Sequence, residues 1–505
     1  MTENKRQVEK LPTGIPGFDH ICNGGLPKGR TTLVTGTAGT AKTVLACQFL
    51  VEGIRQGEAG VFVTFEESVE DIRRNMLSFG WDIAQMEAEG RWLFVDAARQ
   101  TDESVVIGSY DLTALIARIQ YAVSKIGAQR VSLDSLGAIL TRYTDMGILR
   151  REMFRIAHTL KIIGVTTIMT AERVEEYGPI ARYGVEEFVA DNVIILRNVL
   201  EEEKRRRTIE ILKFRGTSHR KGEFPFTIIP GQGIVAIPLS AIQLRQRSSD
   251  LRITSGSPEL DRMCGGGFFR DSVLLVSGAT GTGKTLMATG FMAGGAMNGE
   301  RCLLFAFEES RDQLFRNAIG WGYDFEEMER QGLLKVHCEY PEVAGLEDHY
   351  VEMKRIIEEF RPNRVAIDSL SALERISTNK GFREFVIALT SFIKHQEVAG
   401  LFTSTTPTLL GGTSITEAHI STITDSIILL RYVEVYGEMR RGLTVLKMRG
   451  SMHDKEIREF TIDKRGMHIG KPFRDISGIL SGNFTRLVPD ELSRLSNLFK
   501  DEESS

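Results

Sequence analysis

The sequence contains two copies of one long pattern, and this duplication narrows the folds that the chain can adopt. Residues 14–43 align without gaps on residues 256–285, at an offset of 242, with 13 identities in 30 positions. The tetrapeptide FEES at 65–68 recurs at the same offset, at 307–310. A repeat of this length indicates a duplicated domain rather than the short unit of a solenoid.

The two copies differ in length between FEES and the next shared strand. Asp134 in VSLDSL pairs with Asp368 in VAIDSL at an offset of 234, so the offset falls by 8 and the second copy is that much shorter. We therefore predict an N-terminal domain at 1–246, a second domain at 247–485 and a flexible tail at 486–505.

Composition places the chain among ordinary globular proteins. It has 505 residues, of which 42% are hydrophobic and 26% charged, and a formal net charge of -4. This charge gives no overall attraction to nucleic acid or to an acidic membrane. The 5 cysteines form no CxxC pair, and we find neither a secretion signal nor a stretch long enough to span a membrane. We expect a cytoplasmic protein.

Each copy carries a short apolar strand, a glycine-rich turn and then a helix, which is the pattern of a phosphate-binding loop. Lysine in this loop reaches the outer phosphates of a nucleotide, and the following Thr hydroxyl binds Mg²⁺. We predict that ATP binds the loop residues Gly36, Thr37, Ala38, Gly39, Thr40, Ala41, Lys42 and Thr43 in the first copy, and Gly278, Ala279, Thr280, Gly281, Thr282, Gly283, Lys284 and Thr285 in the second.

The first loop departs from the pattern at one position. Ala41 stands where the second copy has Gly283. Alanine costs little there if its backbone angles are helical, and more if φ is positive. We expect nucleotide binding to survive at this site.

A second shared strand in each copy ends in a pair of carboxylates. These are Glu66 and Glu67 in the first copy and Glu308 and Glu309 in the second. A carboxylate beside a phosphate loop can orient or deprotonate the group that attacks the γ-phosphate. The alternative is a solvated pair at the start of a helix, where acidic residues are favoured. The identical spacing of both pairs from the loop lysine favours a catalytic role.

A third shared strand ends at Asp134 in the first copy and at Asp368 in the second. An Asp at the carboxyl end of a parallel strand commonly completes the Mg²⁺ site together with the loop threonine, here Thr43 or Thr285. Helix capping is the alternative role.

The last shared element is K-x-R-G at the end of a strand. It contributes Lys213 and Arg215 in the first copy and Lys447 and Arg449 in the second. Such side chains can stabilise the charge that develops during phosphoryl transfer when an adjoining subunit supplies them. Surface salt bridges are the alternative. Head-to-tail contacts that close by rotation give a ring, so such residues imply a cyclic assembly with nucleotide at its interfaces.

Together these duplicated motifs resemble the RecA-like ATPases, and their arrangement over nearly the whole chain is similar to the KaiC family of circadian clock proteins. The resemblance implies an α/β fold with two tandem RecA-like P-loop domains, each a mainly parallel twisted sheet flanked by helices. It also implies a homohexamer with one ring per copy. The first ring would be an ATPase, and the second an autokinase and autophosphatase that uses ATP and Mg²⁺.

The resemblance assigns the phosphoacceptors to Ser421 and Thr422 in HISTITDS. The corresponding residues of the first copy are Glu187 and Phe188, which have no hydroxyl. Without the family, a Ser-Thr pair among β-branched residues would simply indicate a strand. The family implies that Glu308 acts as base toward the acceptor with Glu309 beside it, and that Arg375 lies near the acceptors.

In the first copy, Glu66 and Glu67 would position the hydrolytic water. The resemblance further implies a KaiB-like partner on the first copy, near the extra residues at about 98–110. It leaves open whether a KaiA-like activator meets the tail.

Two other functions fit part of the sequence. A RecA-type ATPase that moves on DNA would need basic DNA-binding loops, which are not evident in the sequence, although KRRR at 204–207 is a small basic cluster. A nucleotide-gated scaffold would bind its partner even with hydrolysis abolished. DNA binding that depends on salt would indicate the DNA-dependent ATPase. Partner binding by a variant without Glu66 and Glu67 would indicate the scaffold.

Overall fold

The structure is a computed structural model of the chain. It describes residues 8–97, 112–140, 145–184, 186–201, 204–237, 248–406, 420–435, 437–474, 476–477 and 485–486. The chain divides into two compact units, residues 1–241 and 242–505. The domain boundary that we predicted at 246/247, and all but the first residue of the predicted tail, lie outside the described residues.

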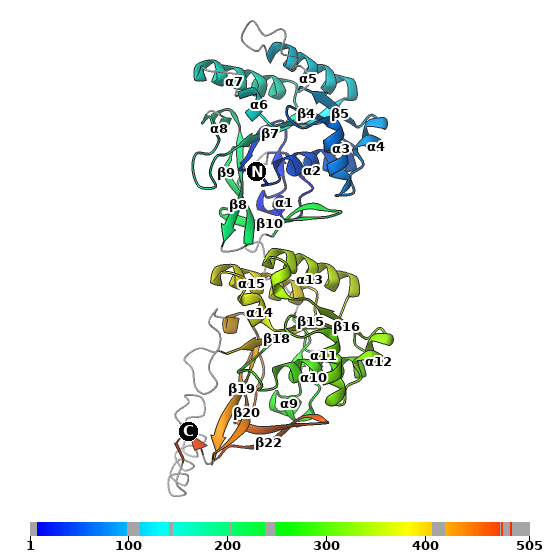
Figure 1. Cartoon of the computed structure of the whole chain (residues 1–505), viewed down its shortest axis with the longest axis vertical. Helices are drawn as coiled ribbons and strands as arrows, with labels where there is room; N and C mark the ends of the chain where they lie inside the picture. Colours follow the sequence, from blue (N-terminus) through cyan, green and yellow to red (C-terminus); the bar gives the residue numbers. More distant parts are fainter. Residues whose placement is uncertain are drawn as a thin grey trace, which may run out of the picture. The chain divides into compact units, whose positions relative to one another are not determined.

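The first unit is built on one nine-stranded sheet with helices on both faces (Figure 1). Two short strands, β1 (Lys10–Leu11) and β2 (Leu26–Pro27), form a separate two-stranded sheet. The nine strands of the main sheet are β3 (Thr31–Gly36), β4 (Ala59–Thr64), β5 (Trp92–Asp96), β6 (Ala128–Asp134), β7 (Thr166–Glu172), β8 (Asn192–Glu201), β9 (Lys204–Phe214), β10 (Glu223–Ile229) and β11 (Gly233–Ala236). Its helices are α1 (Phe18–Ile21), α2 (Lys42–Arg55), α3 (Val69–Leu77), α4 (Ile83–Ala88), α5 (Leu112–Ile126), α6 (Gly137–Leu140), α7 (Met146–Ile162) and α8 (Glu186–Val189).

The second unit repeats this architecture. Its strands are β12 (Arg252–Ile253), β13 (Phe268–Phe269), β14 (Val273–Gly278), β15 (Cys302–Ala306), β16 (Leu334–Cys338), β17 (Arg364–Asp368), β18 (Ala399–Thr405), β19 (Ser426–Val435), β20 (Glu438–Met448), β21 (Arg458–Asp463), β22 (Gly466–Pro472), β23 (Ile476–Ser477) and β24 (Thr485–Arg486). Its helices are α9 (Pro258–Met263), α10 (Lys284–Met297), α11 (Arg311–Gly320), α12 (Phe325–Arg330), η3 (Pro341–Val343), α13 (Leu346–Phe360), α14 (Leu370–Glu374), α15 (Asn379–His395) and η4 (Ile420–Thr422).

The two large sheets have the same strand order. It runs β5-β4-β6-β7-β3-β8-β9-β10-β11 in the first unit and β16-β15-β17-β18-β14-β19-β20-β21-β22 in the second. In this spatial order, the first six strands of each sheet, which end at β8 and at β19, are parallel. The remaining pairings are antiparallel. The strand that leads into the phosphate loop is therefore central in each sheet. This confirms the predicted fold of two tandem α/β domains with mainly parallel sheets.

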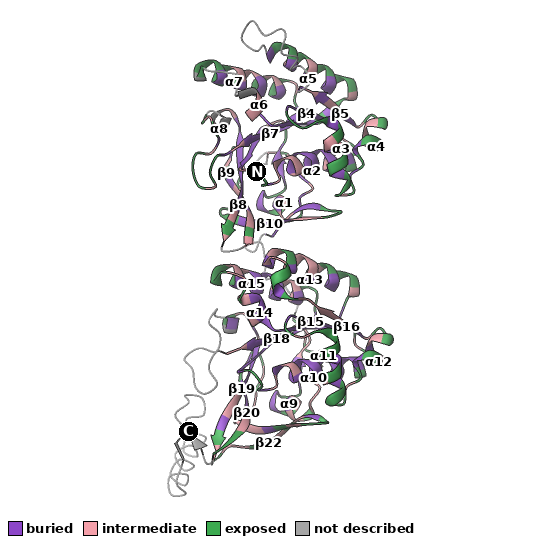
Figure 2. Cartoon of the chain, viewed as in Figure 1, coloured by how far each residue is buried: buried purple, intermediate pink, exposed green. Residues whose placement is uncertain are grey.

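Each central strand is buried on both faces, because successive side chains point to opposite sides of the sheet. In β3, Leu33 packs in the cluster formed with α5 and α7, whereas its neighbour Val34 packs with α2 and α3. In β14, Leu275 packs with α13 and α15, and Val276 packs with α10. Figure 2 shows the resulting pattern, with buried residues in the sheets and exposed residues on the outer sides of the helices.

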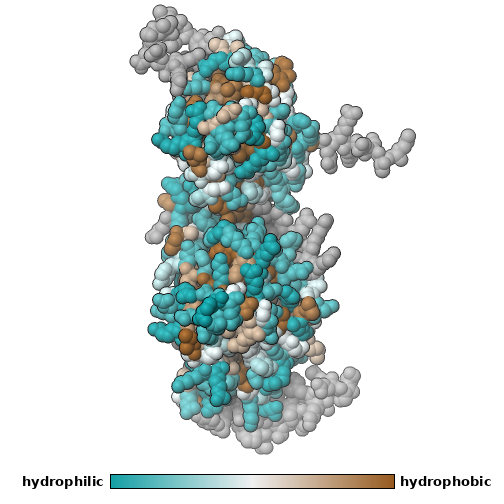
Figure 3. Space-filling model, turned by 90° about the vertical axis from the view of Figure 1, so that its right-hand side faces the viewer, coloured by the Kyte–Doolittle hydropathy of each residue, from teal (hydrophilic) through white to brown (hydrophobic). Residues whose placement is uncertain are grey.

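Exposed hydrophobic residues are present in both units, among them Leu77, Phe154, Leu251 and Met452. On the face drawn in Figure 3, hydrophobic residues lie among hydrophilic residues in both units. None of the helices in the part of the chain that the structure describes is long and apolar enough to cross a membrane.

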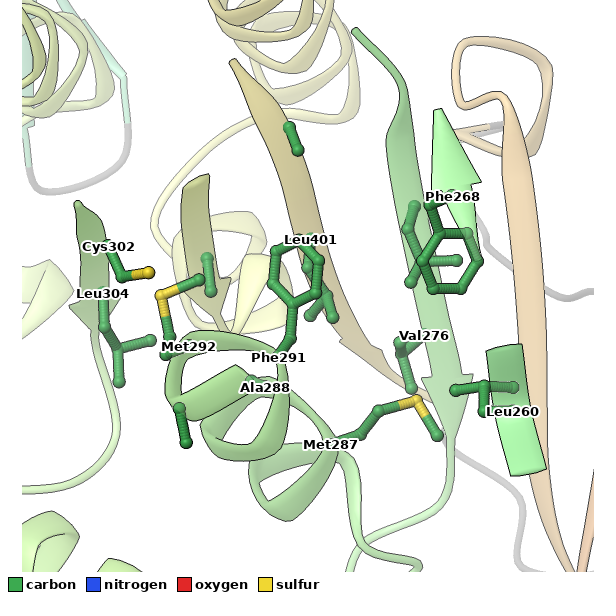
Figure 4. Packing of buried hydrophobic residues seen from close by; sticks show 14 of the residues in the cluster. Leu260, Phe268, Val276, Met287, Ala288, Phe291, Met292, Cys302, Leu304 and Leu401 are labelled. Atoms are coloured by element: carbon green, nitrogen blue, oxygen red, sulfur yellow. The ribbon is translucent and has the colours of Figure 1, made fainter. Parts of the chain in front are cut away.

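The core around α10 brings side chains from several strands together. Phe291 and Met292 of α10 lie among Leu304 of β15, Leu401 of β18 and Val276 of β14 (Figure 4). Because such interiors are close-packed, deleting a large side chain leaves a cavity.

We predict that Leu304→Ala lowers the free energy of unfolding by about 2–5 kcal/mol, since Leu304 is fully buried and its removal leaves a cavity. Urea-induced unfolding followed by circular dichroism measures this loss. Leu251→Ala is the matched control, because Leu251 is 62% exposed and should change the stability by less than about 0.5 kcal/mol. Equal losses in the two variants would contradict the assignment of this core.

Candidate functional site

The two phosphate loops lie at the carboxyl ends of the central strands. The first joins β3 to α2 and the second joins β14 to α10. The neighbouring strands β7 and β18 end at the same level, where Glu172 pairs with Gly36 and Thr405 with Gly278. Side chains at these strand ends therefore converge on the loop, as is usual for ligand sites in parallel sheets.

Both loops need a residue with positive φ immediately before the helix. Gly283 has φ 104° and ψ 22°, and Ala41 occupies the same place with φ 69° and ψ 31°. Of the two cases considered for Ala41, the less favourable one applies, because its φ is positive and its backbone is left-handed. For an L-residue this conformation is strained.

The loop lysines are drawn into their own loops. Lys42 Nζ donates to the carbonyls of Gly36 and Thr37, each at 2.9 Å, and Lys284 Nζ donates to the carbonyl of Ala279 at 3.0 Å. Burial lowers the pKa of both lysines, and the nearby carboxylates oppose this shift. The ammonium groups thus lie within the curve of the loop, where phosphate oxygens bind in this motif.

A hydrogen bond joins the start of each loop helix to the third shared strand. Thr43 Oγ1 donates to Asp134 Oδ2 at 2.7 Å, and Thr285 Oγ1 donates to Asp368 Oδ2 at 2.7 Å. The residue that caps α14 is Ser369, whose hydroxyl accepts from the Ala372 backbone, so helix capping is not the role of Asp368. The hydroxyl and carboxylate oxygens are suited to Mg²⁺, which prefers oxygen ligands.

In each unit, a second threonine hydroxyl, which comparison of the two copies did not reveal, also donates to the strand aspartate. Thr170 Oγ1 donates to the other oxygen of Asp134, and Thr403 Oγ1 does the same for Asp368. These two threonines are 233 residues apart, whereas the aspartates are 234 apart, so a single offset does not align them. Burial raises the pKa of Asp368, and the two hydroxyl donors oppose that rise.

The first carboxylate of each FEES motif faces the same strand end. Ser135 Oγ donates to Glu66 Oε1 at 3.4 Å, and Ser369 Oγ donates to Glu308 Oε2 at 3.1 Å. Of these two carboxylates, only Glu308 forms an ion pair within the described residues, with Arg375, whose guanidinium lies 3.1 Å away. Arg375 therefore lies beside the predicted base.

The second carboxylate of each motif lies beside the aspartate, with Glu67 exposed and Glu309 partly buried. Burial raises the pKa of Glu67, and the charge of Asp134 raises it further. Burial and the charge of Asp368 likewise raise the pKa of Glu309, while a hydrogen bond from Asn317 at 3.1 Å opposes the rise. Both carboxylates hold protons more tightly than ordinary glutamates do.

Neither FEES pair serves to start a helix. Ser68 caps α3 by accepting from the Asp71 backbone, and Ser310 forms a capping box with Gln313 at the start of α11. The glutamates precede these caps, and their side chains lie on the side of the sheet end where the phosphate loop is.

The comparisons with known proteins agree with this geometry. The family model described as "ATPase: KaiC" matches residues 11–241 and 253–473. The circadian clock protein KaiC3 of Synechocystis sp. is 70% identical over 496 residues, which are 98% of each chain. The circadian clock oscillator proteins KaiC of Thermosynechococcus vestitus and Synechococcus elongatus are each 57% identical, over 99% and 98% of this chain and 96% and 95% of their own.

The chain belongs to the KaiC family of ATPases. The predicted resemblance is thereby confirmed, and ATP binding follows from it. The duplicated family match also agrees with the two nine-stranded sheets.

In the first unit, the basic K-x-R-G side chains do not approach their own phosphate loop. Lys213 Nζ donates to the carbonyls of Glu187 at 3.0 Å and Ala190 at 2.7 Å. The Arg215 guanidinium lies 3.6 Å from the Asp191 carboxylate. Both therefore bind the segment that enters β8, beside the beginning of β3.

The second unit repeats this arrangement. Lys447 Nζ donates to the carbonyl of Thr424 at 2.7 Å, and Arg449 donates to the carbonyl of Thr422 at 3.0 Å. Arg449 also lies 3.8 Å from the Asp425 carboxylate. The basic pair thus supports the segment that contains the predicted phosphoacceptors.

That acceptor segment forms the short helix η4, and the Thr422 side chain is exposed there. The Ser421 side chain lies outside the described residues. So does the region 98–110, near which we predicted a KaiB-like partner.

We predict that Ala41→Gly stabilises the first unit by about 0.5–1 kcal/mol, because glycine adopts the left-handed conformation without strain. Gly283→Ala should instead cost about 1–2 kcal/mol, since φ is 104° and the new Cβ would lie 3.1 Å from Ile462 Cδ1. Thermal unfolding of both variants measures these changes. A loss of stability in Ala41→Gly would contradict the strain at this position.

Proposed function

We propose that this KaiC-family chain hydrolyses ATP in its first unit and transfers the γ-phosphoryl group to its own Ser421 and Thr422 in the second, with each site completed by a neighbouring copy. One observation carries the proposal. In each unit, the phosphate loop follows the end of the central strand, whereas the basic K-x-R-G residues lie level with the beginning of that strand.

Strand register gives the separation in the first unit. Phe214 pairs with Asn192, and Asn192 pairs with Thr32, so Arg215 lies about level with Thr31. The loop begins at Gly36, which is about 16 Å further along the strand at roughly 3.3 Å per residue. An arginine side chain cannot span this distance, and Arg215 points to Asp191 instead. The first unit therefore cannot bring this charge to its own nucleotide.

The second unit has the same separation, and it applies to the acceptors too. Met448 pairs with Ser426, and Ser426 pairs with Leu274 at the beginning of β14. Thr422 precedes this point and contacts Arg449. An acceptor at this end receives phosphate from the nucleotide of another copy, so donor and acceptor meet between subunits. Head-to-tail contact of this kind closes into a ring, and the family resemblance favours six copies.

The chemistry differs between the units because their side chains differ. Glu308 would accept the proton of an acceptor hydroxyl, and its carboxylate accepts hydrogen bonds from Arg375 and Ser369. Glu66 and Glu67 face water instead, since Glu187 and Phe188 replace the hydroxyls in the first unit. In the reverse reaction, the phosphoryl group would pass from Ser421 or Thr422 back to ADP, and hydrolysis of the ATP so formed would complete the autophosphatase activity.

Magnesium fits the same place in both units. Thr43 with Asp134, and Thr285 with Asp368, provide oxygen ligands at the carboxyl end of the sheet. Bound Mg²⁺ supplies neutralisation of the phosphate charge. The basic residues from the neighbouring copy then stabilise the remaining charge in the transition state.

Two alternatives are less favoured. A DNA-dependent ATPase would need the basic cluster at 204–207 to be available, but Arg205 donates to the Asn198 carbonyl and Arg207 to the Gly39 carbonyl. A nucleotide-gated scaffold without a kinase cycle leaves the acceptor pair and the base Glu308 without a role. We further propose a cytoplasmic location and a KaiB-like partner, and leave a KaiA-like activator open.

We predict that phosphate passes between chains in mixed particles. A donor chain carries Ser421→Ala and Thr422→Ala, and an acceptor chain carries Lys284→Ala, which removes the loop contact to ATP. Neither chain should be phosphorylated alone with Mg-ATP. After co-expression with tags of different mass, the acceptor chain should gain phosphate at residue 421 or 422, as intact-mass analysis and peptide mapping can measure.

Phosphorylation of the unaltered chain serves as the positive control, and Glu308→Gln in the donor chain should abolish transfer. If the unaltered chain is phosphorylated but the acceptor chain in verified mixed particles is not, transfer occurs within one chain and the proposed geometry is wrong.

We also predict a pH effect at the first site. Burial raises the pKa of Glu66, and the charge of Glu172 raises it further, against the opposing Lys42 and Ser135. Because a base must be ionised, hydrolysis should fall as pH drops through this raised pKa. Glu172→Gln removes one negative charge, so the acidic limb of kcat/KM should move to lower pH by about 0.5–1 unit.

The measurement is ATP hydrolysis between about pH 5 and 8 in a Lys284→Ala background, which leaves the first site to be observed. Glu175→Gln is the matched control, since this exposed glutamate lies three residues from Glu172 and should leave the limb in place. A shift to higher pH in Glu172→Gln would contradict the prediction.

A further inference from the structure

In the first unit, a loop far along the chain is attached to the phosphate loop. The segment 173–184 follows β7, and its Glu176 carboxylate accepts a hydrogen bond from Thr37 Oγ1 at 2.5 Å. The other carboxylate oxygen accepts from the backbone N–H of Asn198 in β8 at 3.1 Å. Glu176 therefore joins the second residue of the phosphate loop to the sheet.

The backbone around Glu176 is itself held in place. Arg173 is 6% exposed and donates to the carbonyls of Gly178 and Pro179, at 2.8 and 3.0 Å. Arg197, also buried, donates to the Glu176 carbonyl at 3.2 Å. The carboxylate consequently reaches Thr37 from a fixed support rather than from a free surface loop.

Thr37 is the point at which several restraints on the loop meet. Its carbonyl accepts from Lys42 Nζ at 2.9 Å and from Thr40 Oγ1 at 2.8 Å, while its hydroxyl donates to Glu176. Two residues further on, the Gly39 carbonyl accepts from Arg207. The loop is thus restrained from inside by Lys42 and from outside by Glu176.

The second unit holds its phosphate loop differently. Ala279 stands in the place of Thr37 and has no hydroxyl to donate. Tyr432 stands in the place of Asn198, and its hydroxyl lies so near Gly281 that a Cβ there would be 2.8 Å from it. The carboxylate restraint at this loop position is therefore absent from the second unit, since alanine cannot take part in it.

We propose that Glu176 is a positioning residue of the first nucleotide site, fixing the phosphate loop through the Thr37 hydroxyl before ATP arrives. The proposal rests on the nucleotide site proposed above. A loop that is already ordered loses less conformational entropy on binding. Removing the restraint therefore weakens ATP binding and leaves the chemical step, which depends on Glu66 and Glu67, largely as it was.

The test measures KM and kcat of ATP hydrolysis in the full-length chain with Lys284→Ala. Thr37→Ala and Glu176→Ala should each raise KM roughly tenfold, which corresponds to ~1.4 kcal/mol, with kcat changed less than about twofold. Thr37→Ser retains the hydroxyl and should restore KM. Glu176→Gln retains one acceptor oxygen for Thr37 but turns its NH2 group toward the Asn198 N–H, so its KM should lie between those of Glu176→Ala and the parent chain.

The double variant Thr37→Ala with Glu176→Ala should be no worse than the more affected single variant, because both remove one interaction. Glu175→Ala is the matched control, since its exposed carboxylate lies on the same segment and should leave KM unchanged. KM within twofold of the parent in both single variants, a lower KM in Glu176→Ala, or multiplying effects in the double variant would overturn the proposal.

Failure of the nucleotide site itself would look different. Lys42→Ala removes the loop lysine and should abolish hydrolysis in this background. If Lys42→Ala has no effect, the assignment of the first site is wrong. If Lys42→Ala abolishes hydrolysis while Thr37→Ala and Glu176→Ala leave KM unchanged, only the role of Glu176 is wrong.

Discussion

The hydrogen bond between the loop threonine and the strand aspartate is the contact on which both sites depend. It joins Thr43 to Asp134 and Thr285 to Asp368 at the same distance of 2.7 Å. Each bond ties the first turn of the loop helix to a strand end that is separated from β3 or β14 by one further strand. Because the loop, the helix and the two strand ends are fixed together, the FEES carboxylates face one defined place rather than a flexible opening.

This arrangement also limits what one chain can do alone. Ligand-binding groups gather at the carboxyl ends of the parallel strands, whereas the antiparallel strands β9 and β20 return the K-x-R-G residues to the opposite end. The strand order thus separates the phosphate loop from the basic residues that we propose act on the nucleotide of a neighbouring copy. A neighbouring copy is the simplest means of reuniting them, and the KaiC-family identity of the chain is consistent with this.

The repeat predicted the fold and most of the strand ends, because buried strands and glycine-rich loops leave strong patterns in a sequence. It could not reveal Thr170 and Thr403, since a one-residue change of offset separates them from the aligned aspartates. The positive φ of Ala41 was open for a different reason, as the residue type alone does not fix the backbone. Glu176 left no signal, because its partner Thr37 is 139 residues away and the second copy has alanine in the place of that partner.

The two copies share the side chains at the phosphate loop and the neighbouring strand ends, and they differ in the residues around them. Lysine, threonine, aspartate and the glutamate pair are kept in both units, so both retain the means to hold and polarise a nucleotide. What varies is the group that we propose receives the phosphate, a hydroxyl of Ser421 or Thr422 in the second unit, and the contact that restrains the loop, a carboxylate on Thr37 in the first. Because the shared hydrogen-bonded framework fixes the reacting groups, the surrounding residues are free to diverge, and two related sites can acquire different reactions.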